Sequence, residues 1–154
     1  MSVLSSIIGE SLVRLHAEAE NWEDAIRKGG QLLVDDGRVS EAYVQGMIDS
    51  VKEVGPYIVI VPHLAMPHAD PALGAVRSGL SILTLATPVW FGNGANDPVK
   101  YVFCLSAADN ADHLLVMRSF VAILEDEHFF EVMDTAKTGG EIVQYMLDHE
   151  VTKN

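Results

Sequence analysis

Hydrophobic and polar positions alternate over residues 13–17 and then change to a wider spacing. The alternation, with an apolar residue at every second position, is typical of a half-buried strand. Over residues 22–33, apolar side chains recur every three or four positions, which predicts a helix with one buried face. Asn21 can cap this helix and Gly37 can end it, whereas Gly29 and Gly30 lower its helical propensity.

A second helical pattern follows Ser40, which is a suitable N-cap residue. The apolar face of this helix contains Tyr43, Val44, Met47, Ile48 and Val51. Gly55 and Pro56 end the pattern. The apolar run from Tyr57 to Val61 then predicts a buried strand.

Two further β-rich runs occupy residues 80–86 and 99–105. The loop between them, residues 91–98, is rich in glycine and asparagine. Together with the earlier strands, these runs predict a central sheet of four or five strands, which is a common sheet size.

The last third of the chain is predicted to be helical. Asn110 precedes a helix whose apolar face contains Leu114, Met117, Val121 and Leu124. The acidic residues 125–127 near its end are expected to be solvated. Residues 138–141 (Thr-Gly-Gly-Glu) have capping-box spacing before a final helix that carries Ile142, Met146 and Leu147. Strands interspersed with helices indicate an α/β fold.

Length and charge limit the class of protein. The 154 residues are 49% hydrophobic and contain no repeat or linker, so residues 1–154 are predicted to form a single domain with a substantial hydrophobic core. The formal charge is −12, from 22 acidic and 10 basic residues. An acidic surface repels nucleic acids and anionic membranes, and it attracts basic protein partners.

The chain shows no membrane or secretion signal. No apolar run approaches the roughly 20 residues of a membrane span, and residues 1–6 lack the basic region of a signal peptide. We therefore expect a cytoplasmic protein that does not insert into a membrane. The single cysteine, Cys104, excludes an internal disulfide and a multi-cysteine zinc site, and its apolar surroundings predict a buried, unreactive thiol.

The segment around His68 is the most informative part of the chain for function. An apolar strand leads into Pro67 and His68, and the fixed φ of proline holds the imidazole on a stiff segment. A neutral imidazole is a competent nucleophile, and its phosphoramidate stays reactive, so a histidine suits a phosphoryl relay. Such a transfer needs positioning and hydrogen bonds to the phosphoryl oxygens. It needs no nucleotide motif and no cofactor, and the glycines of the 91–98 loop lack the Lys and Ser/Thr of a P-loop.

Residues 55–57 (Gly-Pro-Tyr) and 64–69 (Leu-Ala-Met-Pro-His-Ala) resemble a known site. They are similar to the phosphorylation-site region of the EIIA components of the bacterial phosphotransferase system, of the mannitol/fructose type and most of all its ascorbate-specific branch. The resemblance implies a central mixed β-sheet of about five strands flanked by helices. It also implies that His68 accepts a phosphoryl group from HPr and passes it to a cysteine of an EIIB component, which serves the membrane component EIIC in the uptake of ascorbate or a related sugar.

His113 is the second candidate for the site. If Asn110 is the N-cap, His113 is the third helical residue, where free backbone N–H groups and the helix dipole favour an anion. In the family that the chain resembles, a histidine in an Asn/Asp-x-x-His segment lies beside the phosphorylated histidine. The resemblance implies that His113 hydrogen-bonds to a phosphoryl oxygen or to the ring of His68. The alternative is a partly exposed histidine in the first turn of a helix.

Three auxiliary candidates are left with open roles. His63 stands where the family commonly has a small residue such as glycine. We expect it to flank the site without a catalytic role, and a helper role is the alternative. Lys52 lies sixteen residues before His68, where mannitol-type relatives carry an arginine. It could attract a phosphate, or it could only solvate a helix end. Asp70 could orient an imidazole, or it could begin the loop that follows.

Two other functions fit parts of the sequence. A metal-dependent hydrolase could use His63, His68, His113 and Asp70 as ligands, although the chain lacks the helical His-x3-His signature, and we expect no metal. A regulatory module of the same fold would use phosphorylation of His68 to change which protein it binds. The sequence leaves this regulatory alternative open.

Overall fold

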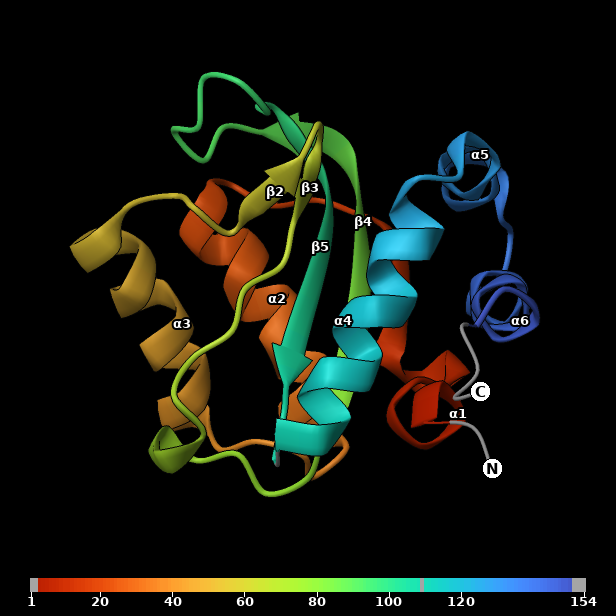
Figure 1. The fold of residues 1–154 in the computed structure, drawn as a ribbon. Helices are drawn as coiled ribbons and strands as arrows, with labels where there is room; N and C mark the ends of the chain where they lie inside the picture. Colours follow the sequence, from red (N-terminus) through yellow and green to blue (C-terminus); the bar gives the residue numbers. More distant parts are fainter. Residues whose placement is uncertain (1–2, 109, 151–154) are drawn as a thin grey trace.

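A mixed sheet of five strands forms the centre of the fold (Figure 1). The structure is a computed structural model that describes residues 3–108 and 110–150, apart from the side chains of residues 3, 110–113 and 115. The strands are β1 (Val13–Ala17), β2 (Val59–Val61), β3 (Leu64–Ala65), β4 (Gly79–Val89) and β5 (Val99–Ser106). They lie in the order β1–β4–β5–β3–β2. The pairs β1–β4 and β3–β5 are parallel, and the pairs β4–β5 and β2–β3 are antiparallel.

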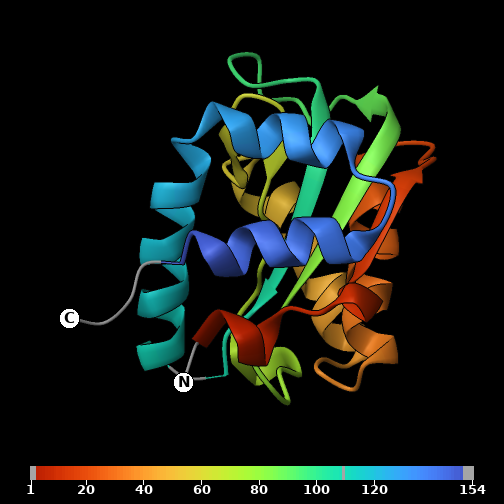
Figure 2. The ribbon, with the colours of Figure 1, turned by 90° about the vertical axis from the view of Figure 1, so that its right-hand side faces the viewer.

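Helices cover both faces of this sheet. One face carries α2 (Trp22–Asp35) and α3 (Glu41–Val54), and the other carries α1 (Val3–Ile7), α4 (Asn110–Leu124), α5 (Glu127–Thr135) and α6 (Gly139–Asp148). Figure 2 shows α5 and α6 lying across the strands, while α4 runs along them. Two short 3-10 turns, η1 (Glu10–Leu12) and η2 (Pro71–Leu73), complete the connections. This arrangement confirms the predicted α/β fold with a mixed sheet.

The middle strands β4 and β5 are buried at most positions because they face two cores. In β5, Phe103 and Leu105 pack against α4, α5 and α6, whereas Val102 and Cys104 pack against α2 and α3. Successive side chains of a strand point to opposite faces, so a strand covered by helices on both sides reads as a continuous hydrophobic run.

The glycine pair in α2 allows this helix to pack closely on two sides. A Cβ atom on Gly29 would lie 2.9 Å from Sγ of Cys104 in β5, and a Cβ on Gly30 would lie 2.8 Å from a methyl group of Val44 in α3. The N-terminus of α2 is capped as predicted, since the side chain of Asn21 accepts a hydrogen bond from the backbone N–H of Asp24 at 2.9 Å. The helix therefore forms despite its low propensity at the two glycines.

The predicted strand from Tyr57 to Val61 is shorter and less buried than expected. It begins at Val59, and the side chains of Tyr57 and Ile60 are exposed. The chain then turns and returns as β3, which pairs with both β2 and β5. A strand of two residues has no periodic pattern, so the sequence does not reveal β3.

The buried face of α4 agrees only in part with the predicted one, because Met117 and Leu124 pack against the core but Leu114 and Val121 do not. Leu114 and Val121 are 62% and 56% exposed, while Val116, Phe120 and Ile123 pack against the sheet. The helix is apolar on more than one side, so hydrophobic spacing alone does not determine which side faces the core.

The acidic residues 125–127 are more than a solvated cluster. Asp126 accepts the backbone N–H of His128 at 3.0 Å and caps α5, a helix that the sequence pattern does not reveal. The hydroxyl of Tyr145 in α6 also donates to Asp126. The start of α6 is as predicted, because the side chain of Glu141 accepts the backbone N–H of Thr138 at 2.9 Å.

Candidate functional site

His68 follows β3 and lies at an open hollow of about 300 Å³. The walls of the hollow come from the last turns of α3, the segment 55–60, the end of β5 and Met117 of α4. Most of these walls are apolar, and besides His68 only Ser50 and Tyr57 contribute polar side-chain groups to the described lining. His68 itself is exposed, although the four residues before it are buried. The imidazole is therefore open to another molecule at an apolar surface.

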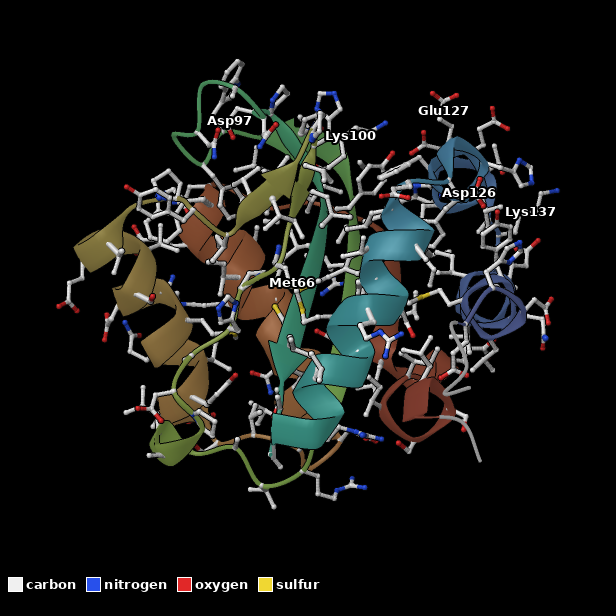
Figure 3. All side chains as sticks on the ribbon, in the orientation of Figure 1. Met66, Asp97, Lys100, Asp126, Glu127 and Lys137 are labelled. Atoms are coloured by element: carbon white, nitrogen blue, oxygen red, sulfur yellow. The ribbon has the colours of Figure 1, made fainter. Side chains whose placement is uncertain are left out.

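One ring nitrogen of His68 is bound to the backbone. Nδ1 lies 2.9 Å from the carbonyl oxygen of Met66, and a carbonyl oxygen can only accept a hydrogen bond, so Nδ1 must carry the proton. In the neutral ring, Nε2 then has the free lone pair. The side chain of Met66, which is labelled in Figure 3, is buried in the core on the α4 side of the sheet. The hydrogen-bond acceptor for Nδ1 is thus held by a packed residue.

The backbone on either side of His68 is anchored by contacts to the turn before β2, to β5 and to α3. The N–H of Met66 donates to the carbonyl of Ile58 at 2.7 Å, and the N–H of Leu105 in β5 donates to the carbonyl of Pro67 at 2.9 Å. The N–H of Ala69 donates to the hydroxyl of Tyr43 in α3 at 3.1 Å. These contacts account for the stiff segment that the Pro-His pair predicts.

Lys52 forms an ion pair with another helix and does not lie at the hollow of His68. Its Nζ lies 3.4 Å from a carboxylate oxygen of Glu23 in α2. Ser50, two residues earlier in α3, lines the hollow, and a helix turns about 100° per residue, so Lys52 stands on another side of α3. Among the described side chains, no Lys or Arg lines the hollow.

His63 lies at the turn between β2 and β3. Its φ is +71°, a backbone conformation that favours glycine. Its ring Nδ1 is 2.8 Å from the carbonyl oxygen of Pro98, and its own carbonyl accepts the N–H groups of Lys100 and Tyr101. These bonds hold the hairpin against β5, and His63 does not line the hollow of His68.

Asp70 caps the turn that follows the site. Its side chain accepts the backbone N–H of Ala72 at 2.9 Å, which stabilises the start of η2. Of the two predicted roles for Asp70, the geometry supports the loop-initiating one, because Nδ1 of His68 donates its hydrogen bond to the backbone carbonyl of Met66 instead.

His113 is in the first turns of α4, but its side chain is outside the described part of the structure. The helix includes Asn110 instead of beginning after it, so His113 is the fourth helical residue and not the third. Met117, one turn later, lines the hollow.

Ser50 and Tyr43 lie at or next to the site but were not predicted to do so. Ser50 carries no motif, and only the path of α3 brings it to the hollow. Tyr43 is visible in the pattern as a buried residue of α3, but no local signal shows that its hydroxyl reaches the backbone next to His68.

Two properties bear on a metal-dependent function and on membrane insertion. Among the described side chains, no three His, Cys, Asp or Glu residues gather closely enough to hold a metal ion, and His63 and Asp70 bind backbone groups. Within residues 3–108 and 110–150, no helix combines the length and apolar character needed to cross a bilayer.

An α/β domain that presents an accessible imidazole at an apolar hollow is the arrangement expected of a phosphoryl carrier protein. The comparison with known families agrees. The family model described as "Phosphoenolpyruvate-dependent sugar phosphotransferase system, EIIA 2" matches residues 6–149. The chain belongs to this family, and it is therefore a phosphotransferase component that carries a phosphoryl group in sugar uptake.

Individual relatives support the assignment. The chain is 37% identical over 144 residues to the ascorbate-specific EIIA component of Escherichia coli K12, covering 93% of this chain and 94% of that protein. The mannitol-specific cryptic phosphotransferase enzyme IIA of Escherichia coli has a TM-score of 0.80 at 32% identity, covering 95% of this chain and 98% of that one. The complex of enzyme IIAMTL with phosphorylated enzyme IIBMTL from Escherichia coli gives a TM-score of 0.79 at 25% identity, with 92% and 97% covered.

Proposed function

We propose that His68 is the residue that carries the phosphoryl group, with Nε2 as the accepting atom. The observation that carries this proposal is the hydrogen bond from Nδ1 of His68 to the carbonyl of Met66, because it leaves the free lone pair on Nε2 of an exposed side chain. The donor is phosphorylated HPr, and the acceptor is a cysteine of an EIIB component. EIIB then serves a membrane component EIIC, and the relay runs in the cytoplasm.

The two transfers balance without a cofactor. In the first, the Nε2 lone pair of His68 attacks phosphorus, and the bond from phosphorus to the HPr histidine breaks. In the second, the thiolate of EIIB attacks the same phosphorus from the opposite side, and the bond to Nε2 breaks. Because the proton stays on Nδ1, the ring leaves as a neutral imidazole, which is a better leaving group than an imidazolate. The carbonyl of Met66 keeps the ring in this protonation state throughout.

Exposed apolar side chains around His68 support docking of protein partners. Val54, Tyr57 and Ile60 are 60%, 76% and 40% exposed at the hollow. On α4, beside Met117, Leu114 and Val121 are also exposed. Such a surface suits a contact that forms and releases quickly. The net charge of −12 favours partners with basic surfaces, and the complex of IIAMTL with phosphorylated IIBMTL supports an EIIB as one of them.

His113 is proposed to assist the phosphoryl group of His68. The support is its place in the first turns of α4, where backbone N–H groups and the helix dipole favour an anion. Its position one turn before Met117 agrees with this role, because Met117 lines the hollow.

The sugar is proposed to be ascorbate or a related compound. This part rests on the identity of 37% to the ascorbate-specific component of Escherichia coli K12. An EIIA contacts proteins and not the sugar, so the specificity would lie in the choice of EIIB.

The test uses phosphoenolpyruvate, enzyme I and HPr, with intact mass as the measurement. We expect the wild type to gain one phosphoryl group, His68→Ala to gain none, and the matched control His63→Ala to gain one. Adding ascorbate-type or mannitol-type EIIB should then discharge the wild type, and the ascorbate-type EIIB should do so faster. No gain by the wild type, with donors that phosphorylate a control EIIA, would contradict the proposal. Phosphorylation without discharge to either EIIB would favour the regulatory alternative.

A further inference from the structure

We infer that Tyr43 is a positioning residue for His68, through a hydroxyl group inserted between α3, β5 and the backbone that follows His68. This inference rests on the proposed role of His68. Tyr43 touches neither the phosphoryl group nor a partner. It acts by setting where the imidazole stands.

The segment that leads to His68 first pairs with β5 in a parallel β-ladder. The pairing of β3 with β5 ends at Ala65 and Val102, but the chain continues beside β5, and the N–H of Leu105 donates to the carbonyl of Pro67 at 2.9 Å. In a regular parallel ladder, the carbonyl of Leu105 would accept the N–H found two residues after Pro67, which is that of Ala69. His68 would then be paired within the sheet.

The hydroxyl of Tyr43 occupies the place of that second hydrogen bond. It donates to the carbonyl of Leu105 at 2.7 Å and accepts the N–H of Ala69 at 3.1 Å. The carbonyl of Ala69 lies further away, at 3.3 Å. A hydroxyl has one proton and two lone pairs, so the two shorter bonds form together. The oxygen atom therefore joins two backbone groups that would otherwise bind each other.

Both peptide groups next to His68 are thus tied to Leu105. The carbonyl of Pro67 is bound directly, and the N–H of Ala69 is bound through the hydroxyl of Tyr43. The inserted oxygen moves the chain away from β5 just after His68. This matches the change in exposure, since residues 64–67 are buried and His68 is exposed.

Tyr43 is itself held firmly. Its side chain is 1% exposed, and its backbone N–H donates to the side chain of Ser40, the N-cap residue of α3, at 3.3 Å. Burial raises the pKa of Tyr43, so the hydroxyl remains a hydrogen-bond donor at neutral pH. A rigid, protonated group is suited to fix the position of a neighbouring segment.

The variant Tyr43→Phe removes only the oxygen and keeps the ring in the core. We expect the kcat of phosphorylation by phospho-HPr to fall by about tenfold or more, because small misplacements of a reacting group are costly. KM should change little, since the exposed docking residues are untouched. Nitrogen NMR of His68 should show a changed balance of Nδ1-protonated and Nε2-protonated rings.

The matched control is Tyr101→Phe. Tyr101 is 4% exposed and its hydroxyl donates to Asp134 at 2.6 Å, so this variant also removes a tyrosine oxygen from a hydrogen bond, but outside the hollow. It should keep the wild-type kcat and the wild-type His68 signals. Equal kcat and unchanged His68 signals in Tyr43→Phe would overturn the inference. If the wild type takes no phosphate, the proposed function fails instead, and the NMR signals of His68 still decide whether Tyr43 positions the ring.

Discussion

Replacing Gly29 by alanine should destabilise the protein, although the same change usually stabilises a helix. Gly29 faces the sheet from the middle of α2, and a Cβ there would lie 2.9 Å from Sγ of Cys104. Normal contacts between carbon atoms are about 3.5–4.0 Å, so the two atoms would overlap. Cys104 is fully buried, and the hydroxyl of Ser81 in β4 donates to the carbonyl of Gly29 at 2.7 Å. Neither the strand nor the helix can move away without losing contacts.

The expected loss is the difference between two opposing effects. Alanine is favoured over glycine in a helix interior by about 1 kcal/mol. Overpacking of a well-filled core costs about 1–3 kcal/mol. The net change for Gly29→Ala is then a loss of about 1 kcal/mol. In the control Gly46→Ala, the Cβ approaches the end of the Leu73 side chain, which is 48% exposed and can rotate away, so a gain of up to about 1 kcal/mol is expected.

Urea unfolding followed by circular dichroism measures both changes. A double-mutant cycle of Gly29→Ala with Cys104→Ala adds a sharper test, because the new methyl group would fill part of the space left by the sulfur. The two changes should couple favourably by about 1–2 kcal/mol. The reasoning is wrong if Gly29→Ala is as stable as Gly46→Ala, or if the effects at positions 29 and 104 simply add.

Three further predictions follow from other contacts. Burial raises the pKa of the Cys104 thiol from 9.0 to about 12. As the pH rises above 9, the thiol therefore loses its proton in the unfolded state before it does so in the folded state. The folded protein keeps its full stability below pH 9 and loses stability between pH 9 and pH 12. In urea unfolding at several pH values, the wild type should lose stability more steeply than Cys104→Ala in this range, by up to about 1.4 kcal/mol per pH unit, and parallel slopes would contradict the prediction. His63 has a φ of +71°, which strains the backbone of alanine but not that of glycine. In thermal unfolding, His63→Gly should therefore be more stable than His63→Ala by about 1 kcal/mol. A less stable His63→Gly would contradict this prediction. Because Lys52 pairs with Glu23, Lys52→Met should leave the phosphorylation rate within about twofold of the wild type and cost at most about 1 kcal/mol, whereas a large drop in rate would place the lysine in the site.

Local signals in the chain predict the elements that depend on neighbouring residues. The caps at Asn21 and Ser40 form as predicted, because each side chain accepts an N–H only three residues away. The Pro67-His68 pair likewise marks the stiff segment, since proline restricts the backbone by covalent structure. The resemblance of the same segment to a known family then indicated the fold and the phosphoryl carrier role, which the comparisons confirm.

Long-range contacts decided the rest. The side of α4 that faces the sheet depends on which of several apolar sides packs best, and the pattern alone predicted it only in part. The ion pair of Lys52 with Glu23 joins two helices, and the hydroxyl of Tyr43 meets a backbone carbonyl 62 positions away. By itself, the sequence determined the helix caps and the strands around residues 13–17, 80–86 and 99–105, because these follow from short-range sterics and periodicity. The candidate histidine came from the resemblance of its segment to a known family. Only the tertiary structure decided which nitrogen of His68 is free and what holds the ring in place, because those properties depend on backbone groups that folding brings together.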